Sequence, residues 1–91
     1  MSVKMTIFYP GLQRAVNGRD SVVVHGGTVA ECLRSLINQF PAAEEWLFDG
    51  QGGLLENVYV HVNAESAAGT GLSRSVTDGD ELIIAIQLVG G

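Results

Sequence analysis

The sequence predicts one α+β domain in which a mixed sheet of four to five strands packs on one main helix. Several stretches alternate apolar and polar residues with the period of a half-buried strand. One stretch instead repeats apolar residues at helical spacing. Glycine and proline pairs separate these stretches. The length of 91 residues is that of a single domain, residues 1–91, with a core of its own.

The chain is expected to open with a β-hairpin. Residues 3–9 alternate, and Phe8 falls on the otherwise polar face, where an aromatic side chain needs an explanation. A Pro-Gly pair then breaks the run and an Asn-Gly pair favours a turn, so residues 10–19 are predicted as a hairpin loop. Residues 20–25 form the second predicted strand, and two glycines end it.

The main helix is predicted to begin at Thr28. Thr28 and Glu31 have the spacing of a capping box, in which the glutamate reaches back to the N-cap amide. One apolar stripe follows at helical spacing: Val29, Cys32, Leu33, Leu36, Ile37 and Phe40. Pro41 ends the helix. A short helical turn at residues 42–47 is expected to carry Trp46 onto the core.

Two further strands are predicted in the second half of the chain. Residues 58–62 alternate, with the valines inward, and residues 81–87 form the last strand. Between them lie a polar, glycine-rich loop at residues 64–75 and a tight turn in which Gly79 takes a positive φ. A hairpin, one long helix and further strands are the order of a β-grasp, a mixed sheet wrapped over one helix.

Composition and charge argue against several classes of function. The net charge is −5, and the five basic residues are scattered, so neither nucleic acid nor an anionic membrane is an expected partner. The sequence shows no signal peptide and no apolar run long enough to span a bilayer, which predicts a cytoplasmic protein. His25 and His61 lack ligand-like spacing, so no metal site is expected. The single cysteine, Cys32, is interpreted as a buried structural thiol.

The last stretch carries a resemblance to a known family. Asp78-Gly79-Asp80-Glu81 is followed, after eight residues, by Gly90-Gly91. With this spacing the chain resembles the ubiquitin-like bacterial sulfur carriers, which include the small subunit of molybdopterin synthase, the thiamine-pathway carrier and a carrier serving cysteine synthesis. The Gly27-Thr28-Val29 helix entry and the Val60-His61-Val62-Asn63 strand support the match, which covers essentially the whole chain.

The same residues leave the pathway open. The Val-Asn ending of the strand at residues 60–63 and the long loop after it look most like the cysteine-pathway branch. Molybdopterin-type members often carry proline just before the end, where this chain has Ile86-Gln87, and Gln87 is closer to the thiamine-type tail. Molybdopterin, thiamine and cysteine synthesis therefore all stay possible.

The resemblance implies a sulfur carrier, a protein cosubstrate and not an enzyme. In this family an ATP-using activating enzyme adenylates the C-terminal carboxylate, which then becomes a thiocarboxylate, and this role falls on Gly91. Leu88, Val89 and Gly90 would thread a thin, flexible tail into the partner, since glycine adds no side chain. The implied partners are the activating enzyme, a sulfurtransferase or other sulfur donor, and an acceptor synthase subunit. No cofactor is expected on the chain, since the activating enzyme uses the ATP.

Strand alternation also predicts a docking surface. Phe8, Tyr59, Ile83 and Ala85 all fall on outward-facing positions and could form one apolar patch that leads to the tail. Exposed apolar patches of this kind often mark partner sites.

Two other functions stay open from the sequence. Gly91 could join to lysines of other proteins, as in a ubiquitin-like modifier. Lys4 is the chain's only internal acceptor, which argues weakly against chains of such modifiers but not against single conjugation. A pure interaction module is the third possibility, although it would not need a terminal Gly-Gly.

Overall fold

The structure, a computed structural model, describes residues 2–51, 53–55, 57–63, 65–66 and 71–86. These residues contain one five-stranded sheet in the order β2-β1-β5-β3-β4. Its strands are β1 (Ser2–Phe8), β2 (Ser21–His25), β3 (Val58–Val62), β4 (Glu65–Ser66) and β5 (Glu81–Ile86). β1 and β5 run parallel, and the other neighbours are antiparallel, so the predicted mixed sheet is confirmed.

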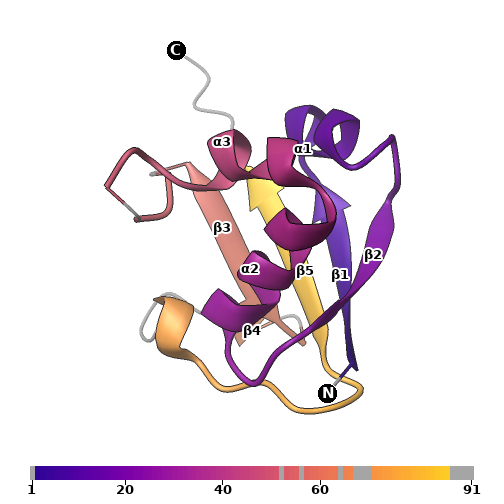
Figure 1. Ribbon diagram of the computed structural model, residues 1–91. Coiled ribbons are helices and arrows are strands. Elements are labelled where there is room, and N and C mark those ends of the chain that lie inside the picture. The colour runs from indigo at the N-terminus through magenta and orange to yellow at the C-terminus, as the bar shows by residue number, and fades with distance from the viewer. Residues whose placement is uncertain (1, 52, 56, 64, 67–70, 87–91) are drawn as a thin grey trace.

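Helices cover one face of this sheet (Figure 1). They are α1 (Pro10–Ala15), α2 (Val29–Gln39) and α3 (Glu44–Leu47), with short 3-10 turns η1 (Pro41–Ala43) and η2 (Gly71–Ser73). The longest, α2, lies across the middle of the sheet, which confirms the prediction of a sheet on one main helix. Among the described residues, no helix is long and apolar enough to cross a membrane.

The core lies between the sheet and α2, and it is apolar. Alternate residues of the strands point into it, because successive side chains of a strand face opposite ways. The strands contribute Val3, Met5, Ile7, Val22, Val24, Val58, Val60, Val62, Leu82 and Ile84. The predicted stripe of α2 supplies four fully buried residues, Val29, Cys32, Leu33 and Leu36, while Ile37 and Phe40 sit at its edge. This burial fixes the strand register, since a shift of one residue would turn every side chain to the other face.

The prediction of a loop at residues 10–19 is wrong in part. β1 and β2 do form the predicted hairpin, but Pro10–Ala15 fold into α1. Pro10 stands at the start of this helix, where its missing N–H is not needed. Leu12 is fully buried, so packing stabilises a helix that is too short to be stable alone. The Asn17-Gly18 pair, with both residues at positive φ, then makes the predicted turn.

Other local predictions are corrected in detail. Thr28 Oγ1 accepts from the Glu31 N–H at 3.2 Å, as expected of a cap, but the Glu31 carboxylate accepts from the Gly27 N–H at 2.7 Å and not from the N-cap amide. The segment at 64–75 is not loop throughout, because it contains β4 and η2. Trp46 does pack against the core, as predicted, although it is only partly buried. It meets Tyr9 edge-on, with ring centroids 6.0 Å apart.

Candidate functional site

β5 connects the acidic turn to the C-terminal residues, so it organises the candidate site. It lies between β1 and β3 and is paired with both along its length. Its last described residue is Ile86. The predicted threading residues Leu88, Val89 and Gly90 and the predicted reactive residue Gly91 lie outside the described residues, so their roles stay predictions.

The acidic turn fastens the start of β5 to the neighbouring strands. Asp78 Oδ1 accepts from the Ser2 N–H at 2.7 Å, which links the turn to β1. Asp80 Oδ1 accepts from Asn63 Nδ2 at 3.0 Å, which links it to the end of β3. Asp80 Oδ2 accepts from the Thr77 N–H at 2.8 Å, which closes the turn itself. We call this set of bonds the acidic clamp.

Asn63 is the residue of the clamp whose role the sequence did not reveal. Its side chain also accepts from the Glu81 N–H at 2.9 Å, so it bridges the last residue of the turn and the first of β5. Its backbone is left-handed, with φ of 51°, a conformation that asparagine tolerates better than most residues. The hydrogen bond from Asn63, followed by that from the Thr77 N–H, lowers the pKa of Asp80. An asparagine directly after a strand was the only signal in the sequence.

The clamp gives the Asp-Gly-Asp-Glu motif a structural explanation. Gly79 has φ of 89°, which confirms the predicted turn, and a side chain at that position would strain the backbone. In the part of the chain that the structure describes, no group of three or more His, Cys, Asp or Glu side chains is placed to hold a metal ion. The motif therefore has a structural role: it sets where β5 starts.

The four predicted docking residues come together on the outer face of the sheet. Phe8 pairs with Ala85 across β1 and β5, and Ala85 pairs with Tyr59 across β5 and β3. Ile83 lies two residues before Ala85, on the same face. Phe8 is 62% exposed and Tyr59 is 41% exposed, whereas the two β5 residues between them are half-buried. We call Phe8, Tyr59, Ile83 and Ala85 the docking patch.

Polar side chains border the docking patch. Thr6 lies beside Ile83, and its hydroxyl donates to Glu81 Oε2 at 2.8 Å. His61 flanks Ile83 from the other side. Lys4 lies beside Glu81, further from the tail. An apolar centre with a polar border is the usual anatomy of a protein–protein interface.

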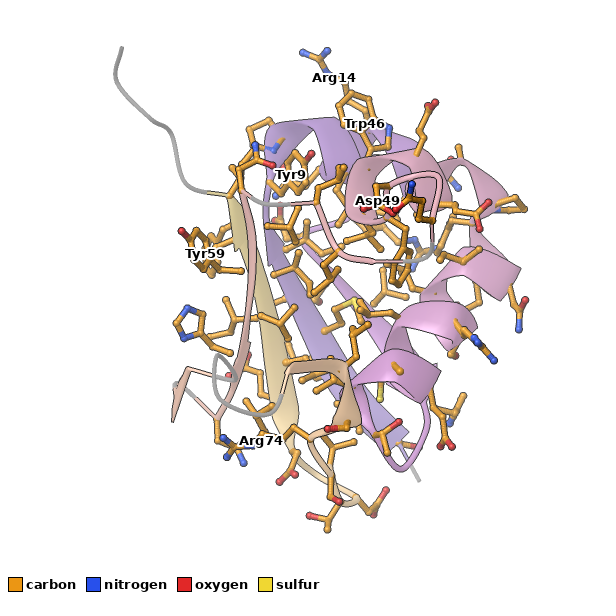
Figure 2. All side chains as sticks on the ribbon, turned by 90° about the vertical axis from the view of Figure 1, so that its left-hand side faces the viewer. Tyr9, Arg14, Trp46, Asp49, Tyr59 and Arg74 are labelled. Atoms are coloured by element: carbon orange, nitrogen blue, oxygen red, sulfur yellow. The ribbon has the colours of Figure 1, made fainter. Side chains whose placement is uncertain are left out.

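The docking patch lies at the end of β5 that leads to the tail. Ala85 is followed by one more strand residue, Ile86, and then by residues 87–91. The acidic clamp lies at the opposite end of the same strand. Tyr59 projects from the face that is turned away from the helices (Figure 2). A protein that covered the docking patch would therefore meet the chain where the tail begins.

Cys32 lies apart from this site. The residue is fully buried in α2, which confirms the predicted buried thiol. Burial raises the pKa of its thiol, and the Glu31 carboxylate raises it further. Because the thiolate is the reactive form, the thiol is suited to packing and not to sulfur transfer.

Comparisons with known proteins extend the structural picture. No protein-family model matches the chain, and a search of the curated proteins also gives no match. Solved structures do match over nearly the whole chain. One is a chain in the crystal structure of the Amycolatopsis orientalis BexX/CysO complex, with a TM-score of 0.86, 28% identity, and coverage of 98% of this chain and 99% of that one.

Two more solved structures are similar to the same degree. SAMP1 of Haloferax volcanii has a TM-score of 0.85 and 28% identity, with 100% of both chains covered. CysO of Mycobacterium tuberculosis, described as an antigen, has a TM-score of 0.85 and 26% identity, with 94% of this chain and 99% of that one covered. Each of the three likenesses covers at least 94% of this chain.

Proposed function

The chain fits the ubiquitin-like sulfur carrier family, as the sequence predicted, and from this premise we propose that Gly91 carries sulfur as a thiocarboxylate. An ATP-dependent activating enzyme adenylates the Gly91 carboxylate, and a sulfur donor converts the adenylate. The chain is then a protein cosubstrate and not an enzyme. Its sulfur passes to an acceptor enzyme that makes a sulfur-containing cofactor or metabolite.

The two steps follow from the chemistry of carboxylates. A free carboxylate is a poor electrophile, so a Gly91 oxygen first attacks the α-phosphate of ATP and pyrophosphate leaves. The acyl-adenylate has a good leaving group, so hydrosulfide released by the sulfur donor attacks the acyl carbon, the acyl–phosphate C–O bond breaks, AMP leaves, and the thiocarboxylate forms with loss of a proton. The chain contributes the carboxylate and a docking surface. The partner contributes the ATP site and the groups that stabilise the charge of the transition state.

The observation that carries this proposal is the place of the docking patch. Phe8, Ala85 and Tyr59 form one row across three strands, directly before the residues that lead to Gly91. An enzyme that holds this patch would receive the tail without reaching around the domain. One similar chain comes from a crystallised complex of CysO with BexX, which supports a function in partnership with other proteins.

The pathway and the location remain parts of the proposal. Molybdopterin, cysteine and thiamine synthesis all use carriers of this kind, and the sulfur donor and the acceptor synthase subunit would differ among them. The cytoplasmic location predicted from the sequence is consistent with an ATP-dependent activation step.

Adenylation gives a direct test in vitro. The activating enzyme, purified from the host through its affinity for the immobilised chain, is incubated with the chain and ATP. We expect exchange of labelled pyrophosphate into ATP that depends on the chain. A chain lacking Gly91 should still fold but should support no exchange. Exchange that is the same with and without Gly91 would exclude this residue as the acceptor of AMP.

A ubiquitin-like modifier is the second candidate function. It is favoured by the similarity to SAMP1, since the Haloferax volcanii protein of that name is described as a small archaeal modifier protein. In this case the activated Gly91 would join to lysine side chains of other proteins. Peptides with Gly91 linked to a lysine, found by mass spectrometry after proteolysis of a host extract, would establish this function.

A further inference from the structure

A second surface lies on the helical side of the sheet, opposite the docking patch. It is a groove of about 690 Å³, lined by residues of α2, α3, the loop after α3, and η2. That volume is in the range of sites that accept small ligands or a few side chains. Asp49, on one rim of the groove, and Tyr59, in the docking patch, lie on opposite sides of the sheet (Figure 2).

Apolar side chains from three separate segments form the floor of the groove. Ile37 comes from α2, Phe48 from the residue after α3, and Leu72 from η2. All three are only partly buried and pack against the core from outside. Phe48 has an extended backbone and bridges to Leu54, which holds its segment in place beside α2. The groove is therefore built on the core and does not depend on one loose loop.

Carboxylates dominate the rim of the groove. Glu44, Glu45 and Asp49 are exposed there, against one base, Arg34, so three negative charges face one positive charge. Asp49 Oδ1 accepts from the backbone N–H of Gln51 at 2.8 Å and of Gly53 at 3.1 Å, which fixes this carboxylate on the rim. Within the described part of the chain, no other side chain engages the carboxylates of Glu44 and Glu45.

We propose that this groove binds a basic segment of a partner protein that carries an apolar anchor side chain. The anchor would fill the space over Ile37, Phe48 and Leu72, where it would remove apolar surface from water. Lysine or arginine side chains flanking the anchor would reach Glu44, Glu45 and Asp49. Charge complementarity of this kind gives partner choice and fast association, and salt weakens it because the charges are exposed.

The position of the groove would allow the chain to bind two partners at once. The docking patch and the groove lie on opposite faces, so the basic segment and an activating enzyme would not compete for the same surface. This consequence rests on the proposed function, whereas binding of the basic segment does not. A carrier held by its helical side could present its tail to one enzyme after another.

A titration with designed peptides tests the groove. The probe is a short capped peptide in which leucine alternates with lysine, added to the isotope-labelled 91-residue chain and followed by amide chemical shifts in NMR spectra. We expect shifts centred on Ile37, Phe48, Asp49 and Leu72, with little change at Phe8 and Ala85. A peptide with serine in place of leucine, and one with glutamate in place of lysine, should each bind at least about tenfold more weakly.

Two charge reversals of equal size supply the matched variants. Glu45→Lys, on the rim, should weaken binding of the leucine–lysine peptide about tenfold, whereas Asp20→Lys, an exposed acid that does not line the groove, should weaken it far less. Equal effects of the two variants would overturn the proposal, because binding would then follow net charge alone. Shifts centred on the docking patch, or no binding, would overturn it too.

Deletion of Gly91 separates this proposal from the proposed function. The truncated chain should bind the leucine–lysine peptide as tightly as the full chain, since the described residues that line the groove belong to α2, α3, the loop after α3 and η2. If the peptide binds but the chain never carries sulfur, the proposed binding groove is supported and the proposed carrier function is wrong. Sulfur loading without peptide binding would show the reverse.

Discussion

Phe8 and Val23 are both exposed apolar residues on the outer face of the sheet, but only Phe8 belongs to the docking patch. Phe8 pairs with Ala85, whereas Val23 pairs with Lys4 and is separated from the patch by polar residues. We expect Phe8→Ala to weaken binding to the activating enzyme about 30-fold, as loss of an interface hot spot of about 2 kcal/mol would. Val23→Ala should change it little. Calorimetry or surface plasmon resonance measures both.

Ile83→Asp tests the same patch from its centre. A carboxylate at this half-buried position would have to be desolvated by a partner, so binding should be lost while the core face of β5 keeps its packing. Thermal unfolding of each variant serves as the control for folding. If Phe8→Ala and Ile83→Asp bind as tightly as the unaltered chain, the activating enzyme does not use this face.

Gly26 and Gly27 precede α2, and the two positions leave different amounts of space for a Cβ atom. A Cβ at Gly26 would lie 2.8 Å from the Cys32 backbone nitrogen, whereas the nearest atom to a Cβ at Gly27 is 3.5 Å away. Gly26→Ala must therefore displace the helix backbone and should destabilise the fold by about 1–3 kcal/mol. Gly27→Ala should stay within about 0.5 kcal/mol. Urea unfolding compares them, and equal midpoints would contradict this packing.

At the scale of elements, the acidic clamp predicts a pH dependence of stability. The hydrogen bonds from Asn63 and Thr77 hold the pKa of Asp80 below its usual value of about 3.9. Because the folded-state pKa is the lower one, the stabilisation is fully present above the unfolded-state value and is lost as pH falls through the folded-state value.

The Asp80→Asn variant measures that stabilisation. Its urea midpoint should fall furthest below that of the unaltered chain near neutral pH, and the gap should narrow below about pH 4. Asn63→Gly removes the first hydrogen-bond donor while tolerating the left-handed backbone, so it should show the same trend. A gap that stays constant with pH would mean that the Asp80 carboxylate does not stabilise the fold.

Elements with a strong apolar period were predictable from the sequence, and short ones were not. The strand at residues 58–62 and α2 have clear periods of two and 3.6, and both appear as predicted. α1 has only six residues, and burial of Leu12, a tertiary contact, stabilises it. β4 has two residues and depends on its pairing with β3. No local sequence pattern predicts such short elements, because tertiary contacts stabilise them.

The candidate site was likewise predictable only where it depends on strand periodicity. The alternation of apolar and polar residues alone predicted that the four docking residues point to one face of the sheet, because successive side chains of a strand point to opposite faces. Their assembly into one patch depends on strand order, which the fold class supplied. The groove on the helical side could not be seen, since Ile37, Phe48 and Leu72 come from segments far apart in the sequence. The bridging role of Asn63 was hidden for the same reason.

At the scale of the whole molecule, the fold presents two candidate binding faces. The outer sheet face carries the docking patch beside the start of the tail, and the helical face carries an acidic groove with an apolar floor. The acidic clamp and the apolar core hold β5 between them. Under the proposed function, other proteins would supply the chemistry at Gly91.

The intact mass of the chain, recovered from its own host during sulfur-limited growth, shows whether Gly91 is activated. We expect a species heavier by the difference between sulfur and oxygen, with the added mass located at Gly91 by fragmentation. A chain lacking Gly91, expressed alongside, should not contain it. A full chain that carries only the unmodified carboxylate under these conditions, with no Gly91–lysine conjugate, would contradict the claim that this terminus is activated.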